Sequence, residues 1–325
     1  MRRALEALVS LLGPNDRLTV IGFARQPRLL AENLSGDRAR EALAVIARTP
    51  AEGGTNLEAA LKLGGELARR HLTAGAQNRI VVLTDGAANL GNAEPARLTA
   101  AVEALRQQGI AFDACGVGLE GIGDTVLEAL TRKGNGRYYA LDSAETADAS
   151  FARQLAGAFR PAAENVKLQV RFNPARVGRY RLIGFEEHRL KTEDFRNDAV
   201  DAAELAAEEA AVALYQVEVL PQGTGELGEV FVRFRDAATG EMFERSWSMP
   251  YEERVPSFAK ATPSLRLAGV AALLAEKFLE TPVADQFKLG DLAEPVNALR
   301  GEYAQQRRVQ ELVTMFTQMR QLTLE

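Results

Sequence analysis

The first half of the chain alternates between two hydrophobic patterns. Its earliest apolar residues repeat at helical spacing, at Leu5, Leu8, Val9 and Leu12. The apolar segments RLTVIGFA, IVVLTDG, IAFDACGVG and GRYYALD are typical of strands. Helices are expected between them and after the last, over residues 37–46, 57–70, 95–108, 125–132 and 147–159. Strands separated by helices predict an α/β fold with a doubly wound, mostly parallel sheet over residues 1–160.

After Pro161 the pattern changes to the period-two alternation of antiparallel strands. The segments VKLQVRF, RYRLIGF, AVALYQVEV and EVFVRFR are rich in β-branched and aromatic residues, and turn residues separate them. They predict a small antiparallel β domain over residues 161–255. Residues 201–211 conflict with this pattern, because their Ala and Glu content favours helix. Helical spacing returns over residues 256–325, which predicts a helical C-terminal segment.

Composition and charge narrow the class of protein. Of the 325 residues, 46% are hydrophobic and 26% charged, a globular composition. The formal net charge of -5 and the lack of a basic stripe argue against a nucleic-acid partner. There is no run of about 18 apolar residues, so no membrane span is predicted.

Cysteine and histidine are too few for several kinds of chemistry. The single Cys115 excludes an internal disulfide and a Cys-rich zinc site, and its apolar surroundings predict a buried small hydrophobe. The only histidines, His71 and His188, are far apart in sequence, so catalysis or metal binding by histidine is not expected.

The stretch IVVLTDG places a carboxylate, Asp85, directly after an apolar strand. Residues 80–83 show no polar alternation, which indicates a strand covered on both faces. Ligands on parallel sheets collect at the carboxyl ends of the strands, where Asp85 is expected to lie. The alternative is an ordinary turn, since Asp and Gly are common turn formers.

Several motifs carry a resemblance to a known family. GGTNLEAAL, followed by IVVLTDG, FDACGVG and GRYYALDS, resembles the von Willebrand factor type A domain. A downstream segment resembles the YfbK-type bacterial subfamily, in which the type A domain precedes a C-terminal domain of its own. The segment is KLQVRFNPARVGRYRLIGFEEHRLKTEDFRNDAVDA, together with the ALY strand that follows it. The resemblance implies a Rossmann-like fold and a protein-binding, adhesion-type module that is not an enzyme.

The resemblance also implies a divalent cation, Mg²⁺ or Mn²⁺, at the top of the sheet. Family members hold it through an Asp-x-Ser-x-Ser loop, a Thr in a second loop and an Asp in a third. Thr55 matches the second loop and Asp85 the third. These hard ions take about six oxygen ligands, and an open position would accept an acidic side chain from a partner protein. Gly53 and Gly54 are expected to let the Thr55 loop turn tightly; alternatively Thr55 caps the following helix, although Asn56 is the better cap.

The first of the three loops is missing from the sequence. No Asp-x-Ser-x-Ser occurs in the 325 residues, and in the family it follows a strand that would precede Met1. We therefore expect an N-terminally truncated chain. In a sheet of order 3-2-1-4-5-6 that strand is central, and its neighbours would lose a ladder partner. Thr55 and Asp85 alone are expected to bind the ion weakly or not at all. The subfamily's frequent association with the cell envelope is expected only of a longer parent protein, so the compartment stays unassigned.

Two other functions compete with metal-dependent adhesion. A metal-free scaffold that binds proteins is the first alternative, because the first loop is missing. The second is a nucleotide-binding or hydrolytic Rossmann-like enzyme. Nucleotide binding is suggested by the Gly pattern GVGLEG at residues 116–121, with Asp142 about 20 residues further on. A hydrolase would need a pair of carboxylates, which Asp85 could form with Asp113 or Asp124.

Overall fold

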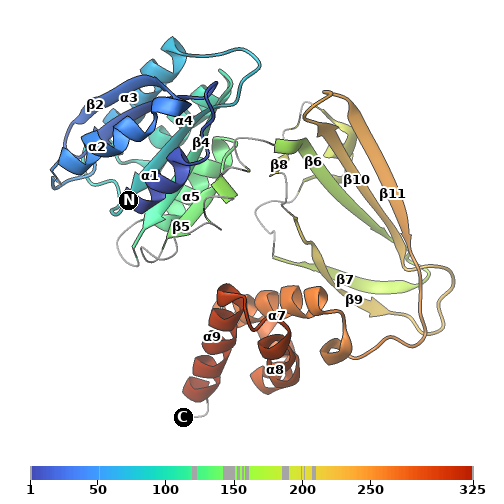
Figure 1. Ribbon diagram of the computed structural model, residues 1–325. Coiled ribbons are helices and arrows are strands. Elements are labelled where there is room, and N and C mark those ends of the chain that lie inside the picture. The colour runs from blue at the N-terminus through green and yellow to red at the C-terminus, as the bar shows by residue number, and fades with distance from the viewer. Residues whose placement is uncertain are drawn as a thin grey trace. The chain divides into compact units, whose positions relative to one another are not determined.

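The computed structural model (Figure 1) describes residues 2–323 except 51, 119–122, 142–150, 152–153, 156, 158–160, 185–189, 199, 201 and 207–209. The chain divides into two compact units. Unit 1 comprises Met1–Asn165, Ala202–Glu209 and Arg235–Glu241, and unit 2 comprises Val166–Asp201, Ala210–Phe234 and Met242–Glu325. The limits 1–160, 161–255 and 256–325 expected from the sequence remain a prediction.

The first part of the chain is an α/β fold, as predicted. Its elements are α1 (Arg2–Val9), β1 (Arg17–Phe23), β2 (Pro27–Ser35), η1 (Gly36–Arg38), α2 (Arg40–Arg48), α3 (Leu57–Arg70), β3 (Asn78–Thr84), α4 (Pro95–Arg106), β4 (Ile110–Val117), α5 (Asp124–Lys133) and β5 (Tyr138–Leu141). Strands β3, β4 and β5 form a parallel sheet in that order, and β1 pairs with β2 in an antiparallel one. The expected helix over residues 147–159 lies mostly outside the described residues.

Helices cover both faces of the parallel sheet. Ile80 and Val82 of β3 belong to the apolar cluster that contains residues of α3, α4 and α5. Val81 and Leu83 pack instead into the cluster with residues of α1 and α2. The unbroken apolar run of β3 is therefore explained by burial from two sides, and the prediction of a doubly covered strand is confirmed. Cys115 of β4 is fully buried, as expected.

Strand β2 was not predicted, and its pairing explains why. Its ladder with β1 is irregular between Leu18 and Ile21, and Asn33 has a positive φ of 51°. Such irregularities interrupt the alternation of faces, so the segment PRLLAENLS carries no clear period of two. Sequence patterning therefore gave no signal for this strand.

The described strands β1 and β3 are each paired on one side alone, β1 with β2 and β3 with β4. Helix α3 lies against both of them. A Cβ added to Gly64 would be 3.8 Å from Ile21 Cδ1 in β1 and 3.6 Å from Ile80 Cδ1 in β3. The resemblance places a central strand between these two, and the described residues form no such strand.

Two further sheets follow, as the antiparallel pattern predicted. The first has the order β11-β10-β6-β8, and β7 pairs antiparallel with β9 in the second. The strands are β6 (Pro161–Phe172), β7 (Val177–Ile183), β8 (Ala203–Ala206), β9 (Leu214–Val219), β10 (Gly228–Asp236) and β11 (Met242–Met249). The helical preference of residues 201–211 is wrong for Ala203–Ala206, because pairing with β6 outweighs a weak intrinsic propensity.

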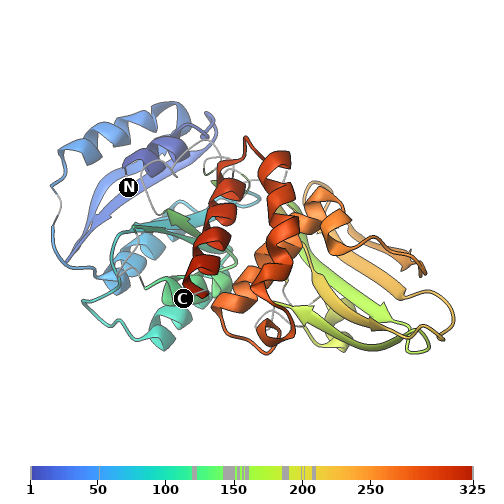
Figure 2. The same ribbon diagram turned by 90° about the horizontal axis from the view of Figure 1, so that it is seen from below.

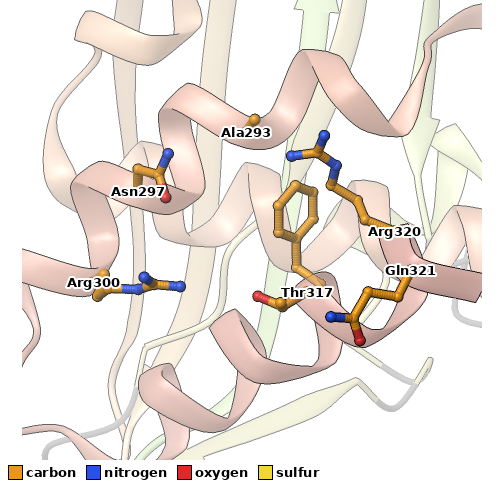
Figure 3. A pocket seen from close by; sticks show the side chains of 7 residues that line it. Ala293, Asn297, Arg300, Thr317, Arg320 and Gln321 are labelled. Atoms are coloured by element: carbon orange, nitrogen blue, oxygen red, sulfur yellow. The ribbon is translucent and has the colours of Figure 1, made fainter. Parts of the chain in front are cut away.

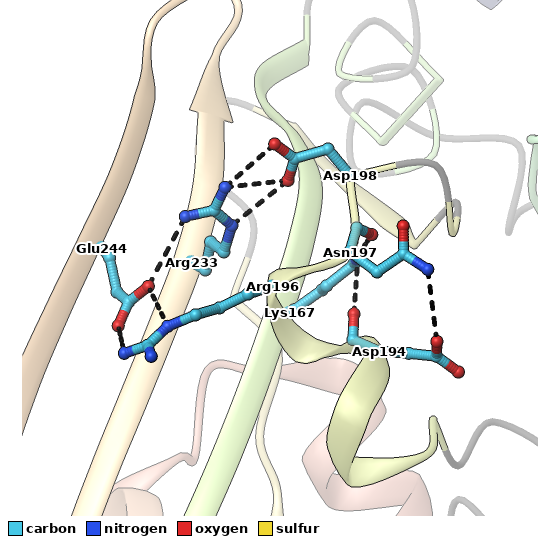
Figure 4. Close-up of polar contacts among 7 residues, drawn as sticks. All are labelled: Lys167, Asp194, Arg196, Asn197, Asp198, Arg233 and Glu244. Carbon is cyan, nitrogen blue, oxygen red and sulfur yellow. Dashed lines mark hydrogen bonds and ion pairs between the residues drawn. The ribbon is translucent and has the colours of Figure 1, made fainter.

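A polar cluster fixes the short 3-10 helix η3 (Thr192–Arg196) in unit 2 (Figure 4). Lys167 is 2% exposed, and its ammonium donates to the carbonyl oxygens of Asp194 at 3.1 Å and Asn197 at 2.6 Å. Arg233 of β10 makes hydrogen bonds to both carboxylate oxygens of Asp198, at 2.9 and 3.0 Å. These charged groups are bound to fixed partners, so we assign the cluster a structural role.

The chain ends in a group of helices that lie side by side in both views (Figures 1 and 2). The elements are η4 (Phe258–Lys260), α7 (Pro263–Phe278), η5 (Ala284–Gln286), η6 (Leu289–Leu292), α8 (Ala293–Glu302) and α9 (Arg307–Thr323). Val270, Leu299 and Phe316 are buried in their shared core. The predicted helical C-terminal segment is confirmed. Within the described residues, we find no helix with the length and apolarity that a membrane crossing requires.

Candidate metal and partner site

The carboxyl ends of β1 and β3 meet at the start of α3. The N–H of Asn56 donates to the carbonyl of Ala24, just after β1, at 2.8 Å. From the loop after β3, the N–H groups of Asn89 and Leu90 donate to the carbonyl of Thr55 at 3.1 and 3.2 Å. Because both strands end at the same end of one helix, β1 and β3 run in the same direction. Their loops therefore gather at one edge of the fold, where α/β proteins bind ligands.

Asn89 ties the two loops of the candidate site together. Its side-chain Oδ1 accepts from the Thr55 N–H at 2.8 Å, while its own N–H donates to the Thr55 carbonyl. This reciprocal pair fixes the position of Thr55 relative to the loop that begins at Asp85. Sequence reasoning missed Asn89; the available signal was an Asn three residues after the TDG turn, since Asn often bonds nearby backbone.

The structure places Thr55 and Asp85 in neighbouring turns. A Cβ added to Gly86 would lie 3.4 Å from Thr55 Oγ1, so this hydroxyl faces the residue that follows Asp85. The Thr84 hydroxyl donates to the Gly86 carbonyl at 2.7 Å and stabilises that turn. Asp85 is exposed, and no described residue donates a hydrogen bond to its carboxylate. Its side chain is available to an external ligand.

The Thr55 hydroxyl is not used as a helix cap. Asn56 caps α3 instead, with its Oδ1 accepting from the N–H of Ala59 at 3.0 Å. Gly54 has a φ of 93°, and a Cβ there would be 2.4 Å from Leu90 Cδ1. The left-handed φ therefore favours glycine at position 54, as predicted. Gly53 shows no such need, because its φ is not positive and an added Cβ would meet nothing within 4 Å.

Thr55 and Asp85 offer the type of oxygen ligand that a hard cation binds, but they supply too few ligands. A hydroxyl and a carboxylate are the oxygen donors that Mg²⁺ and Mn²⁺ prefer, yet these ions take about six ligands. The described part of the chain contains no group of three or more His, Cys, Asp and Glu side chains placed to hold a metal. These residues therefore do not form a complete cation site by themselves.

Asp113 does not form a carboxylate pair with Asp85. It lies in β4, is fully buried, and binds Arg79 of β3 through two hydrogen bonds of 2.7 and 3.1 Å. The N–H of Arg137 donates to the same carboxylate at 2.8 Å. Asp124, the other candidate, accepts from the Tyr138 hydroxyl. The Gly pattern at residues 116–121 and Asp142 lie partly outside the described residues.

Comparison with known proteins finds relatives for most of the chain. The family model "von Willebrand factor type A domain" matches residues 1–153, and "Uncharacterized protein YfbK, C-terminal" matches residues 157–226. "Uncharacterized protein YfbK" of Escherichia coli (strain K12) is 31% identical over 217 residues, which are 67% of this chain. The matched part spans 38% of that relative's length.

A solved structure resembles nearly the whole chain. It is the "von Willebrand factor type A from Catenulispora acidiphila", with a TM-score of 0.54 and 18% identity. The match covers 96% of this chain and 76% of that one. At this identity the similarity shows the fold alone.

Proposed function

Because the chain combines a von Willebrand factor type A domain with a YfbK C-terminal domain, we propose that it is a non-catalytic protein-binding module. Type A domains commonly mediate protein interactions. The proposed partner surface is the loop edge of unit 1, made by residues 53–56 and 84–90. An acidic side chain of the partner would reach it through a bridging Mg²⁺ or Mn²⁺; the alternative is a direct, metal-free contact.

The observation that carries this proposal is the joining of two loops at the ends of the strands. Asn89 holds Thr55 beside the Asp85 turn, and that turn follows a strand that packs into apolar clusters on both faces. An exposed carboxylate and a hydroxyl without a capping role are thus held on a rigid support. Functional groups on such a support bind a partner with little loss of conformational entropy.

The burial of two potentially reactive groups in unit 1 supports a non-catalytic role. Cys115 is fully buried, and burial raises the pKa of its thiol to about 12, so the thiolate that would act as nucleophile is scarce. The carboxylate of Asp113 is neutralised by Arg79. Neither group is available to an external substrate.

The deciding experiment is binding of a purified partner to the full chain. Candidates are captured from a lysate, purified, and titrated by calorimetry against the chain, Asp85→Ala and the control Asp285→Ala, an exposed Asp on η5. We expect Asp85→Ala to weaken binding at least about tenfold and Asp285→Ala to leave it unchanged. Equal affinities for all three proteins would overturn the proposal. Loss of binding in EDTA would identify the metal bridge, and binding that persists in EDTA the metal-free contact.

The cation is tested separately, without a partner. Mn²⁺ is added to the isotope-labelled chain, and paramagnetic broadening of the amide signals is followed by NMR. We expect broadening at residues 54–56 and 85–90 at millimolar Mn²⁺ and its loss in Asp85→Asn, with Asp285→Asn as control. Uniform broadening, or none at this edge, would refute a cation role for Thr55 and Asp85.

A further inference from the structure

A groove follows the seam between α8 and α9 in unit 2 (Figure 3). Its volume is about 270 Å³. Helix α8 contributes Ala293, Asn297 and Arg300, which recur at helical spacing on one face. Helix α9 contributes Phe316, Thr317, Arg320 and Gln321. The groove is thus built from two helices whose packed core holds it in shape.

The groove carries positive charge that the described residues do not neutralise. None of the residues that line it is acidic. By contrast, Arg266 of α7 pairs with Glu302 of α8, and Arg307 pairs with Glu311 within α9. Within the described parts of the chain, no carboxylate lies within ion-pair distance of Arg300 or Arg320. Two guanidinium groups without a counter-charge favour an anionic ligand.

The two arginines lie at opposite ends of the groove. Arg300 is near the end of α8 and Arg320 near the end of α9, and these helices are joined by a short connection, so they run antiparallel. Figure 3 shows Arg320 near Ala293 and Arg300 at the other end. Arg300 is seven positions after Ala293, a rise of about 10 Å along α8. That is the span of about three residues of an extended peptide.

The space between the arginines has an apolar floor and polar sides. The Arg320 guanidinium carbon lies 5.8 Å from the centroid of the Phe316 ring. A guanidinium over an aromatic face keeps the N–H groups at its edge free for a carboxylate. The amides of Asn297 and Gln321 can each donate to and accept from a peptide backbone.

We propose that this groove binds an acidic segment of a partner protein, in which two carboxylate side chains flank an apolar one. The carboxylates pair with Arg300 and Arg320, and the apolar side chain lies between them, in the space that Phe316 helps to line. Charge complementarity selects the occupant, since a chain of net charge -5 presents here two cations that the described residues do not neutralise. This second docking surface does not depend on Thr55, Asp85 or a metal ion.

The test uses the full chain and a fluorescein-labelled peptide, Gly-Ser-Glu-Glu-Leu-Glu-Glu-Gly-Ser, whose binding is followed by anisotropy at low salt. We expect the double variant Arg300→Glu/Arg320→Glu to weaken binding at least about tenfold. The single variants Arg300→Glu and Arg320→Glu should each weaken binding, whereas the control Arg308→Glu, which makes the same single charge change at an exposed position of α9 outside the groove, should leave the affinity within about twofold. Replacing Leu by Gly in the peptide should weaken binding, and replacing Glu by Lys should abolish it.

Three results would overturn this inference. They are no binding of the acidic peptide, equal loss in Arg308→Glu, or binding of vesicles of anionic lipid in place of the peptide. The variant Arg300→Gln/Arg320→Gln, with melting curves for every protein, separates loss of charge from loss of fold. Asp85→Ala should bind the peptide normally, so failure of the loop-edge proposal and failure of this one are distinguishable.

Discussion

A buried ion pair joins strands β3 and β4 of unit 1 and offers a sharp test of its energetics. The side chains of Arg79 and Asp113 are 2% and 0% exposed, and two hydrogen bonds link them. The substitution Asp113→Ala leaves the guanidinium buried without its carboxylate. It also removes the acceptor of the Arg137 N–H. Breaking a buried pair in this way costs about 3–5 kcal/mol.

That cost is large against a typical domain stability of about 5–15 kcal/mol. At its lower end it raises the population of the opened state by about two orders of magnitude. Asp113→Asn should cost less, because the amide oxygen can still accept from the Arg137 N–H. Arg79→Met/Asp113→Leu should also cost less than Asp113→Ala, because an apolar pair leaves no buried charge.

The assay is hydrogen exchange measured by mass spectrometry on the intact chain. The two units need not unfold together, so a single unfolding transition of the whole chain would combine the stabilities of both units. The free energy of opening is read from peptides of β4, and peptides of α9 serve as the internal control. A change below about 1 kcal/mol at β4 in Asp113→Ala would refute the reasoning, since it would mean that the pair is effectively solvated.

Three further predictions concern unit 1. Asn56→Ala removes the cap of α3 and should destabilise its first turn by about 1 kcal/mol in hydrogen exchange, whereas Asn56→Asp keeps an acceptor and should not. Cys115, with its pKa raised to about 12 by burial, should not react with iodoacetamide at pH 8 until urea unfolds the chain; equal rates in both conditions would contradict this. Hydrogen bonds from His71 and Arg70 lower the pKa of Glu32 below its ordinary 4.5, so the stabilisation is present above that pH and is lost as the pH falls through the folded-state pKa. An NMR titration of Glu32 should show the lowered pKa, and an unshifted titration would refute the reasoning. In Glu32→Gln the loss of stability at low pH that Glu32 causes should disappear.

The candidate site was only partly predictable from the sequence. The TDG turn and the GGTN loop indicated Asp85 and Thr55, because each carries a recognisable local motif. Their joining through Asn89 was not predictable, since that bond connects residues 34 positions apart. The two arginines of the α8–α9 groove also gave no local signal, because only helix packing brings them to one surface.

Among the strands, those that were missed are irregular or half-exposed. The segment MFERSWSM became β11 at the edge of its sheet, and four of its residues are exposed. An edge strand buries little apolar surface, so its sequence need not alternate. Strand β8 forms although its residues favour helix, because Ala203–Ala206 pairs with β6.

The sequence by itself determined the α/β class, the helix Leu57–Arg70 and the buried strand that ends before Asp85. In each case the determining interactions are local: hydrophobic period, the Asn56 cap and the glycine turns. Tertiary structure alone decided that Asp113 binds Arg79, that Asn89 holds Thr55, and that β1 and β3 belong to separate sheets among the described strands. Those outcomes depend on burial and on hydrogen bonds between distant segments, and such contacts form only when the chain folds.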